Sequence, residues 1–250
     1  MQNGRISKLN KKYFRKKVYY LLLVWFSLFI SIGIVILMYL LEIKEIITSL
    51  VVFFLLVYLL FMLFFCKTKI TFYDMQQRYQ ELLKKSVGSI KTNCKFDNNW
   101  LKFLEKHNYQ LFVNNSNVTI YFKIEKSLSK KTFISTSLIE IVTIIKKQEL
   151  DAYTDQIEDE LKKLWAIYEK EYHLNKQIIM QFKKYNNFSE DIKKELDRII
   201  SYKEGDNYLI NINCGYIENE AELYFLHSNE YYPNRYYKYA VDIIKEITNL

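Results

Sequence analysis

The chain has 250 residues, half of them hydrophobic, and its 36 basic side chains outnumber its 28 acidic ones to give a formal charge of +8. Its three cysteines lack paired spacing, so neither a disulfide framework nor a cysteine-based zinc site is expected. Its five glycines match neither a P-loop nor a dinucleotide fingerprint, which argues against ATPase and Rossmann activities. The many Lys, Asn, Ile and Tyr residues are typical of an AT-rich genome, so the abundance of tyrosine is not itself a functional signal.

The positive charge is concentrated beside two apolar segments near the N-terminus. Residues 1–17 carry seven basic and no acidic side chains, and residues 67–95 carry seven basic and two acidic ones. Residues 96–250 sum to −3. Because no basic face is indicated on the C-terminal part, a nucleic-acid partner is not expected.

The two apolar segments, residues 18–41 and 46–66, contain no charged side chain. At about 1.5 Å per helical residue, each is long enough to cross a hydrocarbon core of about 30 Å. Only residues 42–45 separate them, so the sequence predicts a two-helix transmembrane hairpin. No small-residue cleavage site follows the first segment, which favours a retained anchor. The absence of charges inside the spans argues against a transporter.

Basic residues flank both ends of the hairpin, which predicts that both termini are cytosolic and that the protein is a multi-pass protein of the plasma membrane. These side chains are expected to contact anionic lipid headgroups. They are Lys11, Lys12, Arg15, Lys16, Lys17, Lys67 and Lys69.

Residues 1–17 form the predicted basic tail, and residues 67–96 a predicted juxtamembrane helix and linker. Within the latter, Phe72, Met75, Tyr79 and Leu82 recur at alternating spacings of three and four. This pattern indicates either a short dimerising coiled coil or a helix that packs on its own domain, and two heptads are too few to decide.

Residues 97–250 are predicted to form one cytosolic domain. Asp97 is a candidate N-cap for a short helix that ends near Asn108. Period-two alternation on either side of residues 114–117 predicts a β-hairpin. Residues 131–145 are rich in β-branched side chains and are predicted as a strand, although a capping box at Ser137 favours a helix that starts there.

The remaining elements alternate between helices and strands. They are a helix over 150–168, a strand over 177–184, a helix over 189–202, strands over 208–214 and 220–227, and a last helix opened by Pro233 and Asn234. The fold class is therefore α+β, with a mixed or antiparallel sheet that carries its helices on one face.

No arrangement of residues indicates catalysis, a cofactor or a metal site. Cys214 and His227 would lie roughly 23 Å apart in the predicted hairpin, at about 3.3 Å per residue, which is too far for a nucleophile and its base. Glu218, Glu220 and Glu222 would share one strand face. Such a row of carboxylates either binds a divalent cation or simply keeps that face hydrated.

Aromatic and basic side chains are interleaved near the C-terminus, at Tyr232, Arg235, Tyr236 and Lys238. Rings flanked by cations suit a surface that stacks on a ligand, but helix residues packed partly in the core explain the same pattern. This tract and the three glutamates form the candidate ligand or partner surface.

These observations favour a membrane-anchored, non-enzymatic module whose cytosolic domain binds a protein partner or a small ligand. The expected partners are an anionic bilayer and either a second protein or further copies of the chain. The alternative is a two-span membrane-disrupting effector, of the type found in bacterial immunity, that is triggered by its cytosolic sensing domain.

Overall fold

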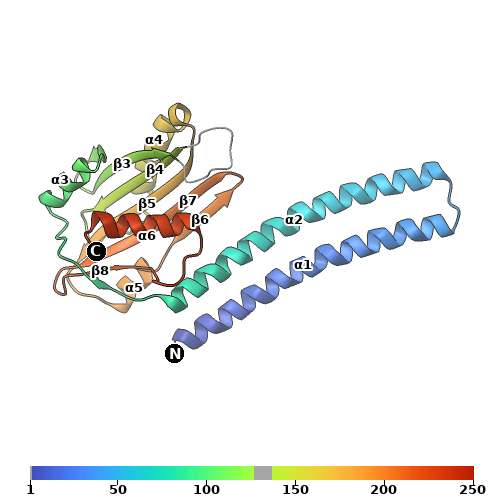
Figure 1. Ribbon diagram of the computed structural model, residues 1–250, viewed down its shortest axis with the longest axis horizontal. Coiled ribbons are helices and arrows are strands. Elements are labelled where there is room, and N and C mark those ends of the chain that lie inside the picture. Colours follow the sequence, from blue (N-terminus) through green and yellow to red (C-terminus); the bar gives the residue numbers. More distant parts are fainter. Residues whose placement is uncertain (1, 127–136) are drawn as a thin grey trace. The chain divides into compact units, whose positions relative to one another are not determined.

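The computed structural model describes residues 2–126 and 137–250 (Figure 1). The chain divides into two compact units, Met1–Lys84 and Lys85–Leu250. The part of the predicted strand that covers residues 131–136 lies outside the described residues.

The N-terminal unit consists of the helices α1 (Gln2–Leu40) and α2 (Glu45–Lys85). Their most apolar windows have mean hydropathies of 2.8 and 2.9, and only 17% and 0% of those windows is buried. A core helix of a soluble protein would be mostly buried, whereas the apolar windows of α1 and α2 are mostly exposed. The prediction of two helices long and apolar enough to span a membrane is therefore confirmed.

Both helices continue well beyond the apolar segments. The 39 residues of α1 correspond to about 58 Å at 1.5 Å per residue, which is nearly twice the thickness of a hydrocarbon core. In this continuation, Lys17 Nζ lies 2.5 Å from a carboxylate oxygen of Asp74, Arg78 donates to the other oxygen at 2.8 Å, and Asn10 donates to Glu81 at 3.3 Å. The segment after the second apolar stretch thus contacts the basic tail of its own chain.

Asp74 is the centre of this contact. Burial alone would raise the pKa of its carboxyl group, but the hydrogen bonds from Lys17 and Arg78 outweigh burial and hold the pKa below its usual value. The carboxylate therefore stays ionised and offsets part of the positive charge that the two helices bring together.

The C-terminal unit is built on one mixed sheet with the strand order β1-β8-β7-β5-β4-β3-β2, in which β6 also pairs with β7. Strands β4, β5 and β7 are parallel to one another, and the other pairings are antiparallel. The strands are β1 (Ile90–Lys91), β2 (Gln110–Asn114), β3 (Val118–Lys126), β4 (Ser137–Ile145), β5 (Leu174–Tyr185), β6 (Ile200–Glu204), β7 (Asn207–Ile217) and β8 (Glu222–Phe225). The mixed sheet is as predicted, and Ser137 starts a strand rather than a helix.

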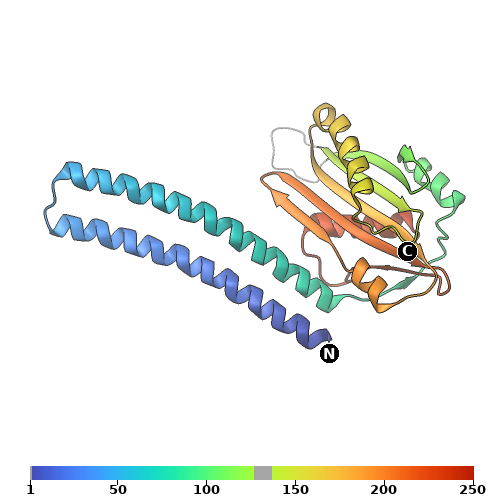
Figure 2. The ribbon, with the colours of Figure 1, turned by 180° about the vertical axis from the view of Figure 1, so that it is seen from behind.

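Helices cover both faces of this sheet, so the prediction that they lie on one face was wrong. Figure 1 shows α6 in front of the strands, and Figure 2, from behind, shows α4 and α5 on the opposite face. Parallel strands need crossover connections and are usually covered on both faces, and here α4 and α5 lie in the crossovers. The helices are α3 (Asn98–Lys106), α4 (Asp155–Tyr172), α5 (Glu190–Leu196) and α6 (Arg235–Ile247).

Two predicted elements differ from the structure. The helix expected over 189–202 ends at Leu196, and Ile200–Glu204 forms β6, because its backbone groups pair with the first half of β7. The glycine of the connecting turn, Gly205, has φ +57°, which suits a residue without a side chain. The stretch predicted as linker contains the short strand β1, which pairs with β8.

The α4 face of the sheet holds an apolar core. Ile157, Leu161 and Leu164 of α4 are buried in one cluster with side chains of β3, β4 and β5, among them Ile120, Phe122, Ile139, Ile141 and Ile179. The helical spacing of the first three and the period of two in the strands account for this packing.

A buried carboxylate occupies the opposite face. Glu140 alternates with Ile139 and Ile141 along β4 and is only 2% exposed. Its two oxygens accept hydrogen bonds from the hydroxyl groups of Tyr109, at 2.7 Å, and Tyr239 of α6, at 2.5 Å. Burial is the largest influence and raises the pKa of Glu140, although both tyrosines and the nearby Lys123 act to lower it.

This raised pKa predicts a pH-dependent stability that the Glu140→Gln variant lacks. The folded chain binds this proton more tightly than the unfolded chain, so the contribution is fully present below the unfolded pKa of about 4.3 and is lost as pH rises through the folded pKa. Between the unfolded and the folded pKa of Glu140, the difference in free energy of unfolding between wild type and variant should change by at most about 1.4 kcal/mol per pH unit.

The measurement is denaturant unfolding of the full chain in lipid nanodiscs over a pH series, followed by tryptophan fluorescence. Glu149→Gln removes an exposed carboxylate and serves as the matched control, with the wild-type pH dependence retained. An unchanged pH slope in Glu140→Gln would contradict this account.

Candidate functional site

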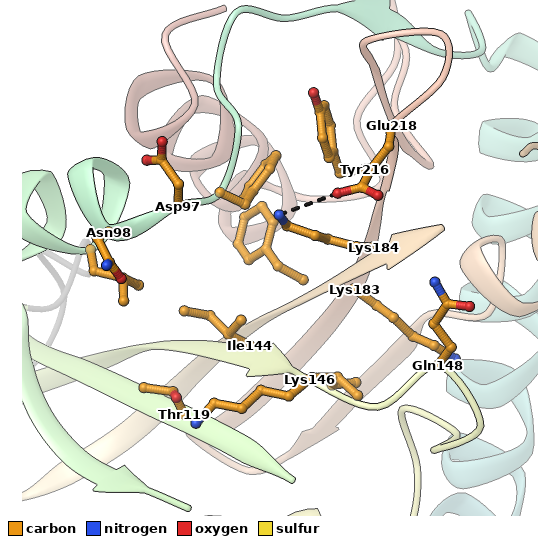
Figure 3. A pocket seen from close by; sticks show the side chains of 14 residues that line it. Asp97, Asn98, Thr119, Ile144, Lys146, Gln148, Lys183, Lys184, Tyr216 and Glu218 are labelled. Atoms are coloured by element: carbon orange, nitrogen blue, oxygen red, sulfur yellow. Dashed lines mark ion pairs between the residues drawn. The ribbon is translucent and has the colours of Figure 1, made fainter. Parts of the chain in front are cut away.

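A cavity of about 380 Å³ lies at the edge of the sheet where the parallel strands β4, β5 and β7 end (Figure 3). Ligands of sheets with parallel strands characteristically bind outside the carboxyl ends of those strands. The cavity is lined by Phe96, Asp97, Asn98, Leu101, Thr119, Ile144, Ile145, Lys146, Gln148, Phe182, Lys183, Lys184, Tyr216 and Glu218. It is therefore the candidate binding site of the C-terminal unit.

One side of the cavity is aromatic. The ring of Phe96 lies 5.3 Å from that of Phe182, 5.1 Å from that of Tyr216 and 4.6 Å from that of Trp100. Trp100 in turn donates its indole N–H to the carbonyl of Ile247, at 2.7 Å, at the end of α6. Phe96, Phe182 and Tyr216 line the cavity, and Trp100 packs against the first two of them. These four rings form the aromatic wall.

Phe96 has a strained backbone. Its φ of +51° lies in the left-handed region, which is rare for a bulky side chain and costs of order 1–3 kcal/mol. The residue that follows, Asp97, caps α3 by accepting hydrogen bonds from the backbone N–H groups of Asn99 and Trp100. The predicted cap is confirmed, and together with the strained residue it turns Phe96 and Trp100 into the same wall.

Lys184 and Glu218 form the charged rim of the cavity. Their side chains pair at 3.3 Å, as the dashed line in Figure 3 marks, and each is a little over two-fifths exposed. An ion pair as accessible as this contributes about 0–1 kcal/mol. It can therefore open at little cost.

The other lysines that line the cavity are held elsewhere. Lys183 donates to Glu195 and to the carbonyl of Leu150, both at 3.0 Å, and its side chain is only 6% exposed. Lys146 donates to Asn114 at 2.6 Å and to the carbonyl of Asn115. Neither ammonium group is aimed at the aromatic wall.

The three glutamates of the predicted surface do not share a strand face, so that expectation was wrong. Strand β7 continues to Ile217, and residues 218–221 form a turn that includes Ala221 at φ +51°. Glu218 lies at the cavity rim, Glu220 is exposed in the turn, and Glu222 on β8 accepts a hydrogen bond from Ser89. Within residues 2–126 and 137–250, no group of three or more His, Cys, Asp or Glu side chains is placed to hold a metal ion.

The tyrosine tract lies at the start of α6. The guanidinium of Arg235 lies 4.9 Å from the ring centre of Tyr236, and the ammonium of Lys238 lies 5.8 Å from that of Tyr232. Tyr236 is buried, with its ring 5.0 Å from that of Tyr208. The cations therefore pair with rings of their own segment, and Tyr236 packs inside the domain.

Cys214 and His227 lie closer together than the predicted 23 Å, because β7 and β8 pair Cys214 with Phe225, two residues before His227. Burial raises the pKa of the Cys214 thiol and lowers the pKa of His227. A ring nitrogen of His227 lies 2.9 Å from the carbonyl of Phe225. A neutral, fully buried thiol is not an activated nucleophile, so the pair gives no support for covalent catalysis.

The aromatic wall and Lys184 were not predicted from the sequence. One signal for them was present, since Phe182 and Lys184 lie at the end of a predicted strand. The end of this strand points to a binding site only if the strand runs parallel to both of its neighbours. The local sequence pattern does not determine strand order or direction.

Comparisons with protein-family models, with curated proteins and with solved structures found no match to this chain.

The aromatic wall predicts that Phe96→Ala destabilises the C-terminal unit by about 3 kcal/mol, the lower range for a buried Phe→Ala change. Alanine keeps the backbone strain at positive φ and leaves a gap beside Trp100. Denaturant unfolding of the full chain in nanodiscs measures the loss, and the emission of Trp100 should shift to the red.

The matched control is Phe188→Ala, which removes a partly exposed phenylalanine from a loop. It should cost less than about 1 kcal/mol, as surface changes generally do. Equal losses in the two variants would contradict a central role for Phe96.

Proposed function

We propose that this chain is a membrane-anchored, non-enzymatic binding module whose α+β domain takes up a small ligand at the cytosolic face of the plasma membrane. The observation that carries the proposal is the cavity at the carboxyl ends of β4, β5 and β7, with an aromatic wall on one side and a charged rim on the other. This combination of an apolar lining and a few polar groups is typical of small-molecule sites.

A binding role fits the chemistry of the lining better than catalysis does. The aromatic wall offers stacking surface, and Lys184 and Glu218 offer charges for orientation. The lining residues include no histidine or cysteine, and Asp97 already caps α3. The described residues that line the cavity thus provide recognition without an evident nucleophile and base.

The anchor in this proposal is the pair of apolar helices with basic residues at their cytosolic ends. Along α1, at about 1.5 Å per residue, Lys17 and Lys16 lie within about 3 Å of the start of the apolar segment, and Lys11 lies about 10 Å from it. The headgroup layer extends about 5–8 Å beyond the hydrocarbon on each side. Lys16, Lys67 and Lys69 should therefore contribute most, at about 1 kcal/mol each. Lys17 should contribute less because it is paired with Asp74, and Lys11 and Lys12 less because they lie farther from the apolar segment.

The orientation can be tested with added cysteines, because the three native cysteines are buried. The variants are expressed in bacteria, and the cells are converted to spheroplasts. A membrane-impermeant maleimide should then label Lys44→Cys in the turn between the helices. It should label Ser116→Cys, an exposed turn residue, only after lysis. The reverse pattern would overturn the proposed topology, and entry of a DNA-binding dye on expression would favour the membrane-disrupting effector instead.

Ligand binding can be tested with four small aromatic probes, namely benzyl alcohol, phenylacetate, phenethylamine and phenylalanine. Saturation-transfer NMR on the full chain in nanodiscs should detect at least one of them, with empty nanodiscs as the blank. Ile144→Trp, which fills the cavity, should weaken that binding at least tenfold.

The matched control is Ile167→Trp, which adds the same ring to an exposed position of α4 and should leave binding unchanged. If no probe binds, or if both tryptophan variants bind like wild type, the cavity is not a site for ligands of this kind.

A further inference from the structure

We infer that the ligand of this cavity is a zwitterion of amino-acid size that carries an ammonium group, a carboxylate and an aromatic or large apolar side chain. The inference rests on the proposed function, because it names the ligand class of the same site. It follows from how the charges of the cavity are already used.

The apolar part of the ligand is assigned to the aromatic wall. Phe96 and Phe182 lie with their ring centres 5.3 Å apart, and Tyr216 extends the same surface. Aromatic rings attract one another in stacked and edge-to-face arrangements at separations of this kind. A ring or a branched aliphatic group in the cavity would thus find partners on one side and the aliphatic Leu101 and Ile144 among the other lining residues.

The charged part is assigned to the rim. Lys184 and Glu218 neutralise each other at 3.3 Å, and both remain accessible. A ligand with a single charge would take one partner and leave the other unpaired. A ligand with both charges replaces the pair completely, because its carboxylate meets Lys184 and its ammonium meets Glu218.

The remaining charged side chains of the lining do not compete for this role. Lys183 is paired with Glu195, Lys146 donates to Asn114, and Asp97 accepts from the first turn of α3. Lys146 and Asp97 keep their opposite charges, because their partners are neutral groups, so apart from the paired Lys183 the lining holds two basic and two acidic side chains. This balance disfavours a phosphate-rich ligand. The cavity volume of about 380 Å³ lies near the lower end of the range of about 300–1,000 Å³ for small-molecule sites.

The experiment compares phenylalanine with phenylacetate, which lacks the ammonium group, and with phenethylamine, which lacks the carboxylate. Dissociation constants are measured by NMR titration of the full chain in nanodiscs. Phenylalanine should bind about tenfold more tightly than either single-charge probe.

Two conservative variants assign the charges. Lys184→Met should reduce phenylalanine binding to the level of phenethylamine and leave phenethylamine itself unaffected or improved. Glu218→Gln should reduce phenylalanine binding to the level of phenylacetate and leave phenylacetate binding unaffected or improved. Lys203→Met, an exposed lysine on β6, is the matched control and should change none of the three constants.

The outcomes separate this inference from the function on which it rests. If benzyl alcohol or a single-charge probe binds in the cavity as tightly as phenylalanine, the ligand class is wrong and the binding function stands. If phenylalanine binding is indifferent to both rim variants, the assignment of its charges is wrong. If no probe binds, the proposed function fails as well.

Discussion

The parallel register of β4, β5 and β7 is the constraint on which the C-terminal unit depends. It brings three carboxyl ends to one edge of the sheet and requires the chain to return along the faces between strands. The α4 crossover supplies the apolar core on one face, and α6 covers the other with the hydrogen bond from Tyr239 to Glu140. The cavity lies at the shared edge because the chain leaves the sheet there three times.

Much of this architecture could be predicted because its signals are local. Uncharged segments identify the two long helices, and the alternation of Val118, Ile120 and Phe122 identifies a strand without reference to any partner. Strand β6 lacks such a signal, because Ile200–Glu204 becomes a strand only through hydrogen bonds to β7. The covering of both faces likewise depends on strand order, which no single segment encodes.

The site illustrates the same limit at the level of side chains. The row of glutamates looked coherent in the sequence, but a turn at residues 218–221 separates Glu218 from Glu222. Glu218 instead meets Lys184 from the neighbouring strand β5, whose position in the chain is 34 residues away. Spacing along one strand is readable from the sequence, whereas pairing across strands requires the register.

The hydrogen bond from Trp100 to Ile247 connects the first and last helices of the C-terminal unit, and Thr92 donates to the carbonyl of Thr248 beside it. Because a protein is synthesised from its N-terminus, the two long apolar helices and most of the sheet emerge from the ribosome before this final turn does. The hydrogen bond that holds the indole of Trp100 can form only when the last turn of α6 is complete. The aromatic wall thus joins the first and last helices of the C-terminal unit, so its complete set of contacts depends on segments that lie 147 residues apart in the chain.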